Sequence, residues 1–237
     1  MTNPLMNRGI KLNYRNRSYS NNIVTLNGVM NKSILLIIIT MIVSLISFTY
    51  LNSPIFILGG SLIGVGLSFM VYFKPEYAKY LAPLYAIVEG VVIGSLSYMF
   101  EYAYEGIVSQ ALFLTFFIFL VMIITYKYRI IKVTDKFKAI IISATLGIML
   151  LYFVGIILSF LGIYIPLFGG GLIGIGFSVF VIIIASLNLL LDFDIIEKMI
   201  ENKAEKYFEW YCAFALLVTL IWIYVEALRL LSKLRSE

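Results

Sequence analysis

Apolar residues fill seven long stretches of the chain, and polar residues gather in the short segments between them. A helix needs about 20 largely apolar residues to cross a bilayer. The stretches are continuous and rich in Leu, Ile and Phe, whereas the strands of a membrane barrel are short and alternate in polarity. The pattern therefore predicts an all-α fold, a polytopic membrane protein with a seven-helix transmembrane bundle, over residues 34–51, 55–73, 82–100, 107–126, 139–161, 172–191 and 211–231.

The composition agrees with a membrane protein of one domain. Of 237 residues, 62% are hydrophobic and 13% are charged, which is more apolar surface than a soluble domain of this length can bury. The first 33 residues are polar and basic and lack the apolar core of a signal peptide. We expect a basic cytoplasmic tail over 1–33, one transmembrane domain over 34–231 and a short polar C-terminus over 232–237.

The positive charges predict how the chain is oriented. Lys and Arg occur before the first stretch and in the segments 74–81, 127–138 and 195–208, while the other three connections contain none. Basic loops stay in the cytoplasm, so we expect an N-terminus in the cytoplasm of a protein of the cell membrane. The net charge of +5 then favours the lipid bilayer as partner and not nucleic acid. Arg229, Lys233 and Arg235 are the exception: either they are tolerated on the outer side, or the last stretch re-enters the membrane.

Two absences argue against catalysis. Cys212 is the single cysteine, and the chain contains no histidine. An intrachain disulfide is excluded, and zinc binding or Cys–His catalysis lacks its usual side chains. We therefore expect no enzyme and no cofactor.

An acid at the end of the sixth stretch is the first candidate site. Asp192 shares a helical face with Asn188, Ala185 and Ser178, which form a narrow polar and small stripe. Acids at membrane depth are often functional, although an interfacial helix cap is the plainer interpretation. Asp194 points elsewhere and, four residues before Lys198, fits an exposed ion pair.

Two further acids lie within apolar stretches. Glu89 is the acid deepest inside such a run, and its burial cost requires a place facing the bundle or a wet cavity. Glu226 shares a face with Cys212 and Thr219, because the three residues recur every seven positions. Its carboxylate is either buried or snorkels to the membrane surface.

A glycine motif occurs twice. GGSLIGVGLSFMV at 59–71 and GGGLIGIGFSVFV at 169–181 share eight of thirteen residues at an offset of 110. Each contains a ridge of small residues that allows close helix packing, led by Gly60 and Gly64 in one and by Gly170 and Gly174 in the other. The match predicts a parallel internal repeat of three helices, one helix and three helices. The alternative is two unrelated glycine-rich packing helices.

Four segments together carry a resemblance to a known family. The chain resembles the bacterial branch of the Bax inhibitor family (transmembrane Bax inhibitor motif, YccA-like) over nearly its whole length. The segments are APLYAIVEG at 82–90, LNLLLDFD at 187–194, EWY at 209–211 and YVEALRLL at 224–231.

The resemblance implies a pH-sensitive calcium leak gated by two aspartates, one at the end of helix six and one in helix seven. Asp192 takes the first position and is the candidate calcium ligand, in keeping with the preference of calcium for oxygen ligands. The second position falls on Thr219 or on Glu226, depending on how the last helix is matched. If it is Thr219, Asp194 or Glu89 would have to share the titration. The alternative function is a non-conducting modulator of a membrane protease or of a membrane stress response.

Overall fold

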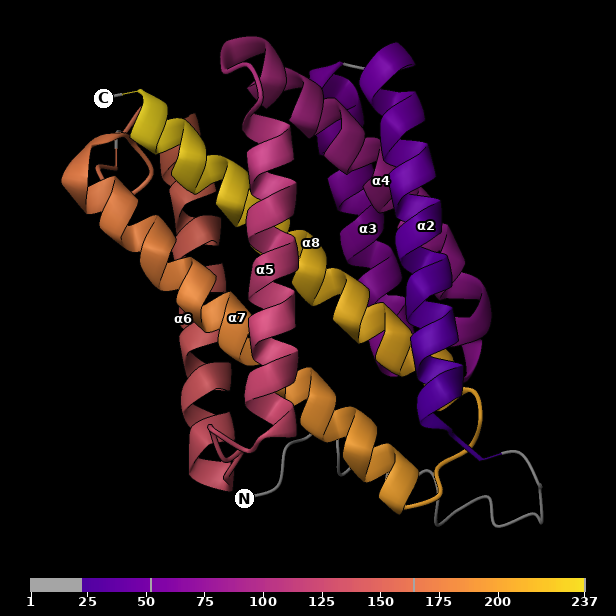
Figure 1. Cartoon of the computed structure of the whole chain (residues 1–237). Helices are drawn as coiled ribbons and strands as arrows, with labels where there is room; N and C mark the ends of the chain where they lie inside the picture. The colour runs from indigo at the N-terminus through magenta and orange to yellow at the C-terminus, as the bar shows by residue number, and fades with distance from the viewer. Residues whose placement is uncertain (1–22, 52, 164, 237) are drawn as a thin grey trace. The chain divides into compact units, whose positions relative to one another are not determined.

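Membrane-length helices dominate the computed structural model, which describes residues 23–51, 53–163 and 165–236. Within these residues seven helices are long and apolar enough to cross a bilayer, and Ile23 and Glu205 form an isolated bridge without any strand. The prediction of an all-α membrane protein with seven transmembrane helices is confirmed. The helices, labelled in Figure 1, are α2 (Leu26–Tyr50), α3 (Pro54–Phe73), α4 (Ala78–Ala103, after the short η1, Pro75–Tyr77), α5 (Ile107–Lys127), α6 (Asp135–Phe160), α7 (Gly171–Glu201) and α8 (Phe208–Arg235).

Some helices extend beyond the apolar stretches that the sequence predicted for them. Helix α2 begins at Leu26, within the segment predicted as a tail, because the Thr25 hydroxyl accepts a hydrogen bond from the Gly28 N–H at 3.0 Å. The first part of that segment, residues 1–22, lies outside the described residues. Helix α7 continues past Asp192 through the charged sequence to Glu201. Apolar length therefore marks the membrane-spanning part, and a helix can extend beyond it into polar sequence.

The chain divides into two compact units. The first contains residues up to Ala103 together with Asp192–Val218, and the second contains Tyr104–Leu191 together with Thr219–Glu237. Helices α2, α3 and α4 thus belong to the first unit, α5 and α6 to the second, and residues of α7 and α8 to both. The single transmembrane domain over 34–231 stays a prediction.

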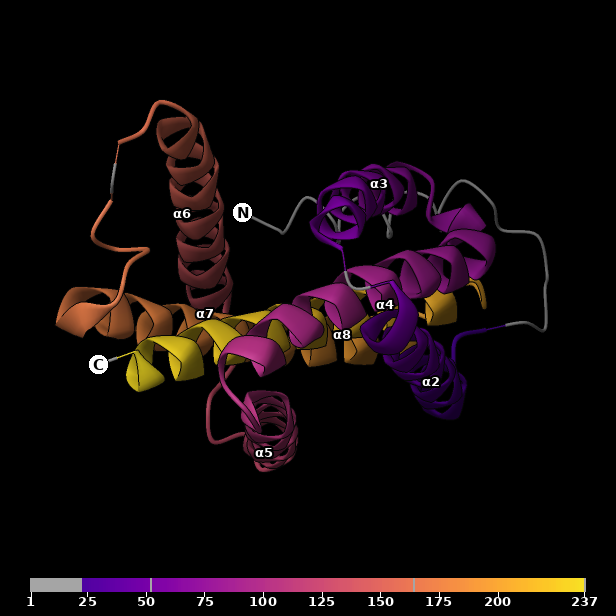
Figure 2. The ribbon, with the colours of Figure 1, turned by 90° about the horizontal axis from the view of Figure 1, so that it is seen from above.

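In the first unit α4 lies between α2 and α3 (Figure 2). On one side, a Cβ added to Gly94 would overlap the backbone carbonyl of Ser44 in α2, and the Ser47 hydroxyl donates to the Val91 carbonyl at 2.9 Å. On the other side, Gly64 of α3 lies against the Glu89 side chain. Gly60, one turn earlier on α3, likewise contacts Val92. Small residues thus let both neighbours approach α4 closely.

In the second unit α6 and α7 share an apolar core. Ile141 and Ile148 of α6 pack with Val181, Ile184 and Leu191 of α7. All five side chains are buried, with 7% exposure or less. This core holds in place the helix faces from which the polar side chains described below extend.

The second glycine motif, in α7 and the loop before it, has different neighbours from the motif in α3. A Cβ added to Gly174 would overlap the carbonyl of Gly169 in the preceding loop, and the nearest group to Gly170 is the Ser236 hydroxyl at 3.4 Å. The ridge of α3 faces a helix, whereas the ridge of α7 faces a loop and the end of α8. The internal repeat stays a prediction.

Candidate functional site

Asp192 and Asp194 lie in the last third of α7, about two turns before the helix ends at Glu201, and both belong to the first unit. Asp192 is half-buried, and Cys212 of α8 is a buried cysteine in the same unit. Asp194 accepts a hydrogen bond from Lys198 Nζ at 2.8 Å, so the predicted ion pair forms, but Asp194 is buried and not exposed as its spacing suggested. Among the described residues no three His, Cys, Asp or Glu side chains cluster closely enough to hold a metal ion. Calcium binding by Asp192 stays a prediction.

The polar stripe that precedes Asp192 is used for packing within the second unit. The side-chain amide of Asn188 donates to the Thr145 hydroxyl of α6 at 2.8 Å and to the Ile184 carbonyl at 2.9 Å. Ala185 and Ser178 are fully buried. The stripe therefore connects α7 to its neighbours in this unit.

Glu89 lies halfway along α4, in the first unit. It is half-buried, and the Tyr85 hydroxyl, one turn earlier on the same helix, donates a hydrogen bond to its carboxylate. Gly64 of α3 leaves the space that the carboxylate occupies. The acid thus faces a neighbouring helix, as its cost in lipid requires.

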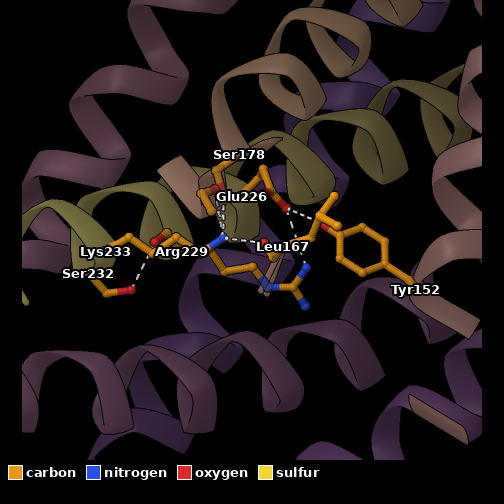
Figure 3. Close-up of polar contacts among 8 residues, drawn as sticks. Tyr152, Leu167, Ser178, Glu226, Arg229, Ser232 and Lys233 are labelled. Atoms are coloured by element: carbon orange, nitrogen blue, oxygen red, sulfur yellow. Dashed lines mark hydrogen bonds and ion pairs between the residues drawn. The ribbon is translucent and has the colours of Figure 1, made fainter. Parts of the chain in front are cut away.

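Glu226 is the most deeply buried acid of α8 and the centre of a polar cluster in the second unit (Figure 3). Its exposed fraction is 0%, and one of its oxygens, Oε2, accepts from the Tyr152 hydroxyl of α6 at 2.8 Å and from Arg229 Nη1 at 3.3 Å. The other oxygen, Oε1, is buried and has no hydrogen-bond partner among the described residues. A buried polar atom without a partner is costly and therefore marks a place where a proton, ion or water can bind.

Arg229 and Tyr152 also interact directly. The Arg229 guanidinium lies 4.9 Å from the centroid of the Tyr152 ring, which itself stacks on Phe168 at 5.5 Å. Phe177 of α7 meets the same ring edge to face at 6.0 Å. The Arg229 side chain remains 43% exposed. It therefore connects a buried carboxylate to a more accessible region.

Lys233, two turns after Glu226, is held by three oxygens. Its ammonium donates to the Ser178 hydroxyl at 2.9 Å, the Gly174 carbonyl at 3.0 Å and the Leu167 carbonyl at 3.3 Å. An ammonium has three hydrogens, and each finds an acceptor here. Arg235 likewise donates to the Glu105 carbonyl at 2.6 Å. The basic residues that depart from the charge pattern of the chain are thus bound to groups of the protein, and α8 is one unbroken helix.

Thr219 and Glu226, the two alternatives for the second acidic position, both belong to the second unit and are both buried. Asp192 belongs to the first unit. The pairing of Asp192 with a residue of α8 stays a prediction.

Sequence reasoning missed several members of these clusters. Arg229 was recognisable, because it follows Glu226 by three residues and shares its helical face. Tyr152 carries a phenol within an otherwise apolar run, which is a weak signal. The contact of Glu209 with the start of α2 gave no signal: its Oε1 accepts from the Thr25 N–H at 3.1 Å and the Thr25 hydroxyl at 3.0 Å, and Lys32 bridges to Oε2.

Comparison with known proteins places the chain in a family. A family model described as Bax inhibitor 1 like matches residues 3–236. No curated protein matches the sequence.

Proposed function

The chain belongs to the Bax inhibitor 1 like family, and on this premise we propose that it is a pH-sensitive cation leak, with calcium as the conducted ion. The family resemblance supplies the expectation of a leak, and the Glu226 cluster supplies a residue that can sense pH. We place the protein in the cell membrane with its N-terminus in the cytoplasm, from the distribution of basic loops. The proposal includes no catalytic step.

The unpartnered oxygen of Glu226 is the observation that carries this proposal. The ionised carboxylate binds Tyr152 and Arg229 through one oxygen, and no described residue donates a hydrogen bond to the other oxygen. A proton on the carboxylate removes the charge that attracts Arg229 and lowers the cost of keeping the group buried. The same site therefore favours two arrangements, one for each protonation state.

The consequence of protonation follows from which helices the cluster joins. Tyr152 is in α6, while Glu226 and Arg229 are in α8. The ionised carboxylate holds α6 and α8 together at this point, and a neutral acid holds them less firmly because hydrogen bonds to charged groups are the stronger ones. The leak should therefore be lower at neutral pH and higher at acidic pH.

Asp192 has a separate role in this proposal. It is half-buried near the end of α7 and its carboxylate can bind a hard cation such as calcium. Glu226 then sets the pH dependence of the leak, and Asp192 sets how well the cation is bound.

Calcium flux into liposomes that contain the purified protein tests the proposal. At acidic pH we expect flux above that of empty liposomes, and at neutral pH a lower flux. Asp192→Asn should lower flux at both pH values while leaving their ratio unchanged. Glu201→Gln, at an exposed position at the end of α7, is the control and should behave as the original chain.

Two results would overturn this function. Flux no greater than that of empty liposomes at either pH would remove the leak and favour a non-conducting modulator of a membrane protease. If Asp192→Asn abolished the difference between flux at acidic pH and flux at neutral pH, the pH sensor would be Asp192 in α7 and not Glu226.

A further inference from the structure

A basic patch lies where the chain turns from α5 into α6, inside the second unit (Figure 1). We call it the α5–α6 patch, and its side chains are all exposed. Between residues 127 and 136 it has four cationic residues and one acid, Asp135. Because it connects two transmembrane helices, it lies at the membrane surface. Its members are Lys127, Tyr128, Arg129, Ile130, Lys132 and Lys136.

Arg129 adopts a backbone conformation that is usually occupied by glycine. Its φ is +51°, in the left-handed region. The Arg129 N–H donates to the Tyr126 carbonyl and the Ile130 N–H to the Thr125 carbonyl, each at 3.0 Å. This pattern closes the C-terminus of α5 in the manner that most often places glycine at the position of Arg129. This conformation costs more for an arginine than for a glycine, and it fixes where the Arg129 side chain leaves the helix end.

Aromatic rings lie beside two cations of the patch, one ring within the patch and one directly before it. The Arg129 guanidinium lies 5.0 Å from the Tyr126 ring centroid, and Lys127 Nζ lies 5.8 Å from that of Tyr128. Tyr128 is 69% exposed and Ile130 is 67% exposed. An aromatic and an aliphatic side chain beside cations are typical of segments that contact the headgroup region of a bilayer.

From these observations we infer that the α5–α6 patch binds the headgroup of an anionic phospholipid. Arg129 and the three lysines together supply the positive charge that attracts a phosphate group. Tyr128 and Ile130 give the contact a preference for a phosphate attached to acyl chains over a free one. The positive charge of the patch attracts anionic headgroups at the membrane surface, and added salt weakens this attraction by screening it.

A matched control exists at the end of α7. Lys203 has φ +50°, and the N–H groups of Lys203 and Ala204 close that helix in the same pattern, onto the carbonyls of Ile200 and Met199. Lys203, however, lies between Glu201 and Glu205, which offset its charge. Lys203→Gly and Arg129→Gly thus relieve the same backbone strain and remove a cation from a helix C-terminus, but only Arg129 belongs to the patch.

The test titrates the purified chain in detergent with fluorescently labelled phosphatidylglycerol, with labelled phosphatidylcholine as the reference lipid. Arg129→Gly should bind phosphatidylglycerol about fivefold more weakly, and Lys203→Gly should bind it as the original chain does. Both variants should show a raised melting temperature, because glycine adopts a left-handed φ without strain. A second variant with Lys132→Gln and Lys136→Gln should also bind phosphatidylglycerol more weakly, which decides the matter if Arg129→Gly does not fold.

Three outcomes would overturn the inference. Undiminished phosphatidylglycerol binding in Arg129→Gly, or in the double lysine variant if Arg129→Gly does not fold, would show that the patch is not the site. Equal binding of phosphatidylcholine would show that charge is not recognised. Displacement of the labelled lipid by inorganic phosphate alone would indicate a site for a small anion. None of these readouts depends on ion flux, so failure of this inference is distinct from failure of the proposed function.

Discussion

At the scale of single residues, the carboxylate of Glu226 is bonded on one side only. Tyr152 and Arg229 both approach Oε2, while Oε1 is buried and has no hydrogen-bond partner in the described part of the chain. A buried ion pair often contributes little to stability, because desolvation offsets the attraction between the charges. The Arg229–Glu226 pair is therefore expected to add little to stability by itself, and the hydrogen bond from Tyr152 can be tested separately.

The Tyr152 hydroxyl can be removed without disturbing the ring that carries it. Tyr152→Phe keeps the stacking on Phe168 and deletes the 2.8 Å hydrogen bond to Glu226. Loss of a hydrogen bond to a charged group should lower the free energy of unfolding by about 1.5–3 kcal/mol at neutral pH.

Thermal unfolding in detergent measures this loss. Tyr102→Phe is the control, since Tyr102 is 85% exposed, and it should leave the melting temperature unchanged. Equal melting temperatures for Tyr152→Phe and Tyr102→Phe would mean that the Tyr152 hydroxyl does not stabilise the cluster.

At the scale of the elements, close approach of helices is concentrated at a few glycines. Gly94 of α4 meets backbone atoms of α2, namely the Ser44 carbonyl and the Phe48 amide. Gly66 of α3 has nothing within 4 Å of an added Cβ. Glycine spacing in the sequence does not distinguish a contact glycine such as Gly94 from an open one such as Gly66. It does not show which face of a helix packs against a neighbour.

The two glycines should respond to alanine in opposite directions. Gly94→Ala forces α4 away from α2 and should lower the free energy of unfolding by about 1–3 kcal/mol. Gly66→Ala meets open space and should raise it by about 0.5–1 kcal/mol, because alanine loses less backbone entropy in a helix. Melting temperatures of the two variants in the same detergent give the comparison. A Gly94→Ala variant as stable as Gly66→Ala would contradict the packing of α2 on α4 described here.

At the scale of the whole molecule, the sequence predicts the membrane-spanning helices well and their polar contacts poorly. The apolar runs identify all seven helices of the described residues, because burial in lipid imposes one simple requirement on length and composition. The start of α2 is missed, since it depends on Thr25 and on Glu209, which is 184 residues away. Glu226 and Arg229 can be paired from their spacing on one helix. Tyr152 enters the cluster only through the packing of α6, which the hydrophobic pattern leaves undetermined.

The central claim is that protonation of Glu226 sets the pH dependence of a cation leak. Glu226→Gln replaces the carboxylate by an amide of nearly the same shape that does not titrate. Calcium flux into liposomes, measured for this variant at acidic and at neutral pH, tests the claim most directly. We expect equal flux at the two pH values, near the acidic value of the original chain. A Glu226→Gln variant whose flux still rises at acidic pH as in the original chain would contradict the claim.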